Sequence, residues 1–204
     1  MRSVAFASIL LALGLAGCGD PNAGALFADI QYATRCEMAA TPHCGGPKNR
    51  DVCGIDNGDT CEDGVASPSL SCSVQEQDDG TRVVSFGAQQ GSDFSIAVNQ
   101  AVFAPGSSSA GGAGCTVTLT EGANRYRGDC GANPPSEAQP CQINAVRFYD
   151  EMGNPTIEGA IFCQGLENQA NPMLTLEVTQ VGSTPSNEMT PGRFIFQNCD
   201  GLTL

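Results

Sequence analysis

The stretch that decides the fold runs from Cys115 to Cys130 and reads CTVTLTEGANRYRGDC. Its first half alternates threonine with valine and leucine, which is the period of two expected of a strand with one buried face. Glu121 to Asn124 supplies a glycine-containing turn, and the chain then returns from Arg125. The two cysteines bracket this turn, so a centred hairpin places them opposite each other and predicts a Cys115–Cys130 disulfide.

A second hairpin of the same kind follows between Cys141 and Cys163, with its turn at Met152 to Pro155. Both cysteines lie equally far from Met152, so this hairpin also places them across from each other. The sequence therefore favours a Cys141–Cys163 disulfide. A bridge from Cys130 to Cys141, across a loop that contains two prolines, is an alternative that the sequence leaves open.

Several other short runs are rich in β-branched and aromatic residues and are separated by turn residues at near-regular spacing. This pattern predicts a mainly β fold, an antiparallel β-sandwich of jelly-roll or Ig-like architecture, formed by residues 26–204 as one domain. Residues 104–114 are rich in Gly, Ser and Ala and offer no large side chain, so we expect a mobile loop there. The remaining predicted strands are residues 25–36, 82–88, 94–99, 174–179 and 193–199. A helical turn is an alternative within residues 25–36, because Ala and Leu are good helix formers.

The N-terminal part of this domain, residues 36–72, has a different character. It holds five cysteines among many Gly, Asp, Asn and Pro residues and has few apolar side chains. Such a stretch lacks a core of its own, so cross-links must hold it. We expect a disulfide-rich, loop-rich segment laid over one end of the domain, with Cys53 and Cys61 as further disulfide candidates.

The first 18 residues form a unit of their own. Arg2 precedes an apolar run that is too short to cross a membrane, and Leu15-Ala16-Gly17-Cys18 follows. This pattern resembles the type II signal peptide and lipobox of bacterial lipoproteins. The resemblance implies that residues 1–17 are removed, that lipid is attached to Cys18, and that residues 18–25 tether the domain to a membrane.

The residues after Cys18 bear on where such a lipoprotein would stay. Enterobacterial lipoproteins retained in the inner membrane usually carry aspartate directly after the lipidated cysteine. This chain has Gly19 there and Asp20 one place later. The resemblance therefore implies an exported protein anchored in the cell envelope, at the outer membrane where the host has one.

The charge of the chain restricts its partners. It has 22 acidic and 9 basic residues and a net charge of −13. Such a chain repels phosphate backbones, so we expect no nucleic acid partner. The negative charge favours solubility and would also suit a cation-binding surface.

Asp56, Asp59 and Asp63 are the best candidate metal ligands. Together with neighbouring acids and an asparagine they offer several hard oxygen atoms, which Ca²⁺ prefers. Their spacing does not match an EF-hand, and Asp and Asn equally favour tight turns. A calcium-dependent binding or adhesion module is therefore an alternative function, and no other cofactor is predicted.

Catalytic patterns are sparse. His43 is the single histidine, it lies in a Pro- and Gly-rich stretch, and no G-x-S-x-G motif occurs. Paired carboxylates leave a hydrolase open as a second alternative, although the chain has no Trp and only 3 Tyr for stacking on sugars. We therefore expect a non-enzymatic structural or binding module of the envelope with a protein or glycan partner.

Overall fold

The computed structural model describes residues 24–36, 48–52, 68–92, 94–131, 134–179 and 192–204. These residues form one 11-stranded sheet in which all pairings between the named strands are antiparallel, so the predicted mainly β class is confirmed. Among them, no helix is long and apolar enough to span a membrane. The strands are β1 (Phe27–Cys36), β2 (Lys48–Val52), β3 (Ser69–Glu76), β4 (Arg82–Gln90), β5 (Phe94–Phe103), β6 (Thr116–Glu121), β7 (Asn124–Asp129), β8 (Cys141–Glu151), β9 (Asn154–Asn168), β10 (Thr175–Thr179) and β11 (Gly192–Gln197).

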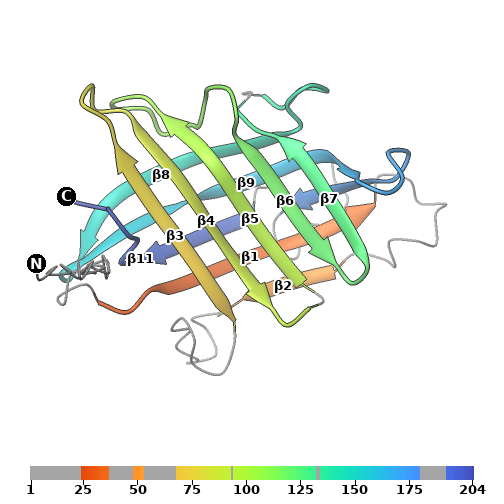
Figure 1. Ribbon diagram of the computed structural model, residues 1–204, viewed down its shortest axis with the longest axis horizontal. Helices are drawn as coiled ribbons and strands as arrows, with labels where there is room; N and C mark the ends of the chain where they lie inside the picture. The colour runs from red at the N-terminus through yellow and green to blue at the C-terminus, as the bar shows by residue number, and fades with distance from the viewer. Residues whose placement is uncertain (1–23, 37–47, 53–67, 93, 132–133, 180–191) are drawn as a thin grey trace, which may run out of the picture.

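The sheet folds over into two layers (Figure 1). One layer is a meander in which β3, β4, β5, β6 and β7 are neighbours in chain order. The other layer contains β8, β9, β11 and β1, with β2 and β10 paired to β1. The last residues of β9 pair with β7, so β9 belongs to the second layer along most of its length and joins the first layer at its end. This β7–β9 corner positions the candidate site.

The two layers pack face to face through aromatic side chains. The ring of Phe86 on β4 lies 4.3 Å from that of Phe194 and 5.0 Å from that of Phe196, both on β11. On β6, Val117 and Leu119 are buried while the alternating threonines are half-exposed. The period of two in the sequence therefore marks the inner face of the sheet, as predicted.

Two disulfides brace the strands around the corner. Cys115 is bonded to Cys130 and Cys141 to Cys163, so each of the two hairpins is closed as its spacing suggested. The alternative bridge from Cys130 to Cys141 is wrong, because each cysteine is bonded to its hairpin partner. These two residues nevertheless form a backbone β-bridge, which places the two disulfides side by side.

A third disulfide, Cys72–Cys199, ties the C-terminal segment to the outer edge of the first layer. The N–H of Val74 donates to the carbonyl of Asp200 at 2.8 Å, and the N–H of Asp200 donates to the carbonyl of Cys72 at 3.0 Å. Gly201 has a φ of +73°, and a Cβ there would collide with the Val74 carbonyl. The segment thus covers an edge of β3 that would otherwise be open to pairing with another chain.

The structure corrects two expectations. The stretch predicted as loop over residues 36–72 contains β2 and the first part of β3, because these residues pair with β1 and β4. The loop over residues 104–114 is attached to β8 through its backbone. The N–H of Ala110 donates to the carbonyl of Ile143, and that of Val146 to the carbonyl of Ser108, both at 2.9 Å. These two backbone hydrogen bonds hold the loop against β8, although it has no large side chain to anchor it.

Candidate binding cleft

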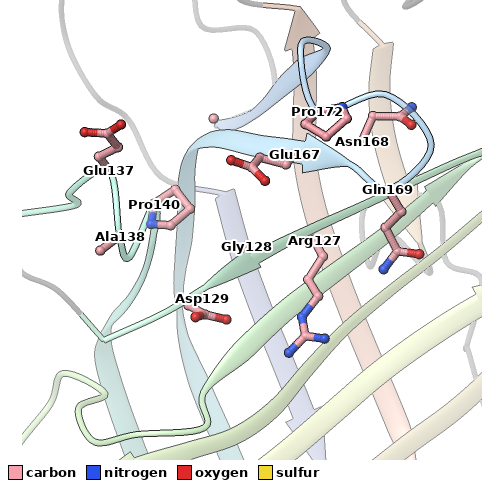
Figure 2. A pocket seen from close by; sticks show the side chains of 11 residues that line it. Arg127, Gly128, Asp129, Glu137, Ala138, Pro140, Glu167, Asn168, Gln169 and Pro172 are labelled. Atoms are coloured by element: carbon pink, nitrogen blue, oxygen red, sulfur yellow. The ribbon is translucent and has the colours of Figure 1, made fainter.

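A cavity of about 400 Å³ lies at the β7–β9 corner (Figure 2). Its lining comes from β7, from residues 137–140 before β8, from the end of β9 and from the loop that leads to β10. Four charged side chains line it, namely Arg127, Asp129, Glu137 and Glu167. It is therefore a polar cleft in which both signs of charge are present.

The floor of the cleft depends on Gly128. A Cβ at this position would lie 2.8 Å from Cδ2 of Leu166 and 2.8 Å from Cγ of Pro140, closer than real side-chain contacts allow. It would also lie 3.4 Å from the sulfur of Cys141, whose disulfide braces the corner. Glycine is required here because three neighbouring elements converge on the backbone of β7.

The alternation of β7 aims two charged side chains outward. Gly128 is buried, whereas Arg127 and Asp129 on either side of it are exposed. Figure 2 shows both of these side chains projecting from β7 at the cleft. Arg127 is directly opposite Glu167 of β9 in the register of the sheet.

The loop after β9 is held by Asn168, whose side chain is buried. Its Oδ1 accepts the N–H of Ala170 at 2.8 Å, and its Nδ2 donates to Oδ1 of Asn124 at 3.1 Å. The backbone N–H of Gln169 donates to the carbonyl of Arg125 at 2.8 Å. Gln169 is thus fixed at the rim, where its amide can donate and accept hydrogen bonds.

The turn before β8 supplies the remaining acid. The N–H of Ser136 donates to the carbonyl of Gln139 at 3.0 Å, and the N–H of Gln139 donates to Oγ of Ser136 at 3.1 Å. This turn displays Glu137, whose side chain extends away from Arg127 (Figure 2). The three carboxylates therefore lie around the rim rather than at one point.

The cross-strand Arg–Glu pair at the cleft differs from the other such pairs in the described strands. Among the described strands, four arginines lie directly opposite a glutamate. Three of these pairs form ion pairs: Arg35–Glu177, Arg82–Glu76 and Arg147–Glu158. The fourth pair, Arg127 and Glu167, makes no ion pair among the described residues, and the two side chains extend in different directions (Figure 2).

A second hollow is lined by residues of β8, β9 and β11, and its charged side chains are already paired with one another. It is lined by Arg147, Glu158 and Arg193. Nη2 of Arg147 lies 2.6 Å from a carboxylate oxygen of Glu158, and Nη2 of Arg193 lies 3.5 Å from the other oxygen. These groups already satisfy one another, so we take the corner cleft as the candidate site.

One further cluster of polar groups lies between the layers. The hydroxyl of Tyr32 is buried and has no hydrogen-bond partner among the described residues. Burial, together with the negative charge of Glu121, raises the pKa of Tyr32 well above 10, although the charge of Arg50 acts in the opposite direction. Arg50 forms an ion pair with Glu121 and lies over the ring of Phe94. The Arg50–Glu121 ion pair of this cluster joins β2 to the end of β6.

None of the residues singled out from the sequence is among the described residues that line the cleft. Cys18, Cys53 and Cys61 lie outside the described residues, as do the calcium candidates Asp56, Asp59 and Asp63. Within the described residues, no group of three His, Cys, Asp or Glu side chains is placed to hold a metal ion.

Sequence reasoning missed the four charged residues of the cleft. The alternation of β7 is the one signal that could have pointed to them, since it predicts that Arg127 and Asp129 face outward together. Nothing local to the sequence brings Glu167 beside them.

No protein-family model, curated protein or solved structure matches this chain.

Proposed function

We propose that this chain is a lipid-anchored, non-enzymatic binding protein of the bacterial cell envelope, located at the outer membrane where the host has one. The N-terminal apolar run and the tetrapeptide ending at Cys18 support the anchor. The β7–β9 cleft supports the binding role. Two or three acyl chains on one residue would be enough for stable attachment.

The observation that carries the binding role is the combination of open charges with a fixed backbone. Two adjacent disulfides, a required glycine and a hydrogen-bonded loop hold the rim of the cleft. A preformed site loses little conformational freedom when a ligand binds, so more of the interaction energy remains as affinity. The cavity volume also lies within the range of small-molecule sites, which is about 300–1,000 Å³.

The anchor is tested by partition into a phase-separating nonionic detergent after expression in a bacterial host. The wild-type protein is expected in the detergent phase, and Cys18→Ser in the aqueous phase. Equal partition of the two proteins would contradict lipidation at Cys18.

The binding role is tested by thermal unfolding of the full chain, followed by far-UV circular dichroism, with sugars, amino acids, short peptides and nucleotides. Ligand at about 100 times its dissociation constant adds about 2.7 kcal/mol to the free energy of unfolding. For a domain of this size that raises the midpoint by about 5–10 °C. A shift that the double variant Arg127→Gln/Glu167→Gln lacks supports binding at the cleft. A panel without any shift contradicts it.

A carboxylate-based hydrolase is the second candidate, because Asp129, Glu137 and Glu167 line one cavity. Glycosidases use two carboxyl groups on either side of the bond that they cleave. Turnover of nitrophenyl glycosides that is lost in Glu167→Gln or Asp129→Asn would favour this candidate. Turnover that is absent, or unchanged in both variants, would leave the binding role ahead.

A further inference from the structure

We infer that the β7–β9 cleft binds a short zwitterionic peptide, with its carboxylate on Arg127 and its ammonium group on Glu167. This inference rests on the proposed binding function and names the chemical class of its ligand.

Arg127 and Glu167 lie opposite each other in the sheet without forming an ion pair with each other. An arginine and a glutamate directly opposite each other on antiparallel strands are close enough to form an ion pair, and the three other such pairs in the described strands do so. At the cleft the same placement leaves the guanidinium and the carboxylate apart (Figure 2). Both groups are therefore available to a ligand, one for each sign of charge.

The guanidinium of Arg127 and the carboxylate of Glu167 each suit one charged end of a peptide. A guanidinium presents paired N–H donors that match the two oxygens of a carboxylate. An ammonium group has three donors and no acceptor, so it suits a carboxylate such as Glu167. The amide of Gln169 at the rim can bond to a peptide group between the two charged ends.

The charges that line the cleft favour a ligand that carries both signs of charge. One arginine and three carboxylates line the cleft, so a simple anion would meet net repulsion. A simple cation would leave the guanidinium without a partner. A ligand that carries both charges satisfies both kinds of group.

The placement of Arg127 and Glu167 sets the distance that the ligand must span. The side chains of Arg127 and Glu167 start on neighbouring strands and extend in different directions (Figure 2). In a free amino acid the ammonium and the carboxylate are attached to a single carbon. In a dipeptide or tripeptide they are separated by one or two peptide groups, which suits two binding groups that diverge.

The experiment is isothermal titration calorimetry on the full lipidated chain in nonionic detergent at low salt, where exposed charges are least screened. The probes are Ala-Ala, its C-terminal amide, N-acetyl-Ala-Ala and free alanine. Ala-Ala is expected to bind about two- to fivefold more tightly than each of the other three, since each lacks one charge or the required span.

Variants then assign each charge to its residue. Arg127→Gln is expected to weaken Ala-Ala binding to the level of the amide probe, without affecting the amide itself. Glu167→Gln is expected to weaken Ala-Ala binding to the level of N-acetyl-Ala-Ala. The matched controls are Arg125→Gln, an exposed arginine on the same strand that does not line the cavity, and Asp78→Asn, an exposed acid far from it in the sequence. Both controls should bind Ala-Ala as the wild type does.

The outcomes separate this inference from the function on which it rests. Equal affinity for all four probes, or equal loss in the control variants, would overturn the zwitterion and leave a binding function. The same conclusion follows if no probe binds while another class of ligand raises the melting midpoint. Circular dichroism of each variant shows whether it is folded. If no ligand of any class shifts the midpoint, the proposed function itself fails.

Discussion

Tyr32→Phe should make this protein more stable. The side chain of Tyr32 is fully buried between the layers, and its hydroxyl has no hydrogen-bond partner among the described residues. Folding therefore removes the hydroxyl from water, and no described residue replaces the lost hydrogen bonds. Phenylalanine retains the ring, including its contact with Phe94 at 6.1 Å between ring centres, and removes the unsatisfied oxygen.

The magnitude follows from two opposing contributions. Desolvation of an unsatisfied buried hydroxyl costs about 1–3 kcal/mol. The void left by one oxygen atom is smaller than a methyl group, so it costs less than about 1 kcal/mol. The net gain is about 1 kcal/mol, which corresponds to a rise of about 2–4 °C in the melting midpoint of a domain of this size.

The pH dependence provides an independent readout of the same residue. Burial and the charge of Glu121 raise the pKa of Tyr32 in the folded state well above 10. The unfolded chain therefore releases this proton near pH 10 while the folded chain retains it, and the free energy of unfolding falls as the pH rises further. This loss is about 1.4 kcal/mol per pH unit. Tyr32→Phe lacks it, so its advantage over the wild type should widen above pH 10.

The assay is chemical denaturation followed by far-UV circular dichroism, at pH 7 and at intervals up to pH 11. Tyr149→Phe is the matched control, because the Tyr149 hydroxyl donates to Glu158 at 3.2 Å. This variant should lose about 0.5–1.5 kcal/mol. If Tyr32→Phe is destabilised at pH 7, or if its difference from the wild type is constant from pH 7 to 11, the reasoning is refuted.

Three further predictions address the disulfides, the cleft and the calcium hypothesis. Replacing Cys72 and Cys199 by serine should lower the free energy of unfolding by about 4–5 kcal/mol, because their disulfide closes a loop of 127 residues in the unfolded chain. Thermal unfolding measures this loss, and a value below about 1 kcal/mol would contradict the prediction. Gly128→Ala brings a methyl group within 2.8 Å of two neighbours and should cost about 1–3 kcal/mol while weakening Ala-Ala binding; unchanged stability and affinity would show that the floor has room. Asp56→Ala and Asp59→Ala should lower the melting midpoint in calcium but not in EDTA, and equal midpoints of the wild type in both solutions would end the calcium hypothesis.

Much of the fold could be predicted because its signals are local. The alternation of threonine with valine and leucine in β6 depends on one strand and its two faces. The Cys115–Cys130 and Cys141–Cys163 bridges depend on the distance of each cysteine from its own turn. A hairpin brings residues together that are already near in sequence, so spacing alone indicates which of them are opposed.

The Cys72–Cys199 bridge and the short strand β2 could not be predicted in this way. The two cysteines belong to opposite ends of the domain and meet because β11 leads the C-terminal segment across to β3. Residues 48–52 are rich in charged side chains and form a strand through pairing with β1. In both cases a partner distant in the sequence supplies the stabilising contacts, which outweigh the local preference.

The sequence by itself determined the β class, favoured the two hairpin disulfides and gave rise to the expectation of an export signal with a lipid-bearing Cys18, because each depends on residues close together in the chain. The tertiary structure alone decided that β9 turns from one layer to the other and brings Glu167 opposite Arg127, with Glu137 at the same rim. A shift of one residue in this register would turn the side chain of Glu167 to the other face of the sheet. The candidate cleft therefore exists through the pairing of two residues that lie 40 positions apart, which no local pattern in the chain specifies.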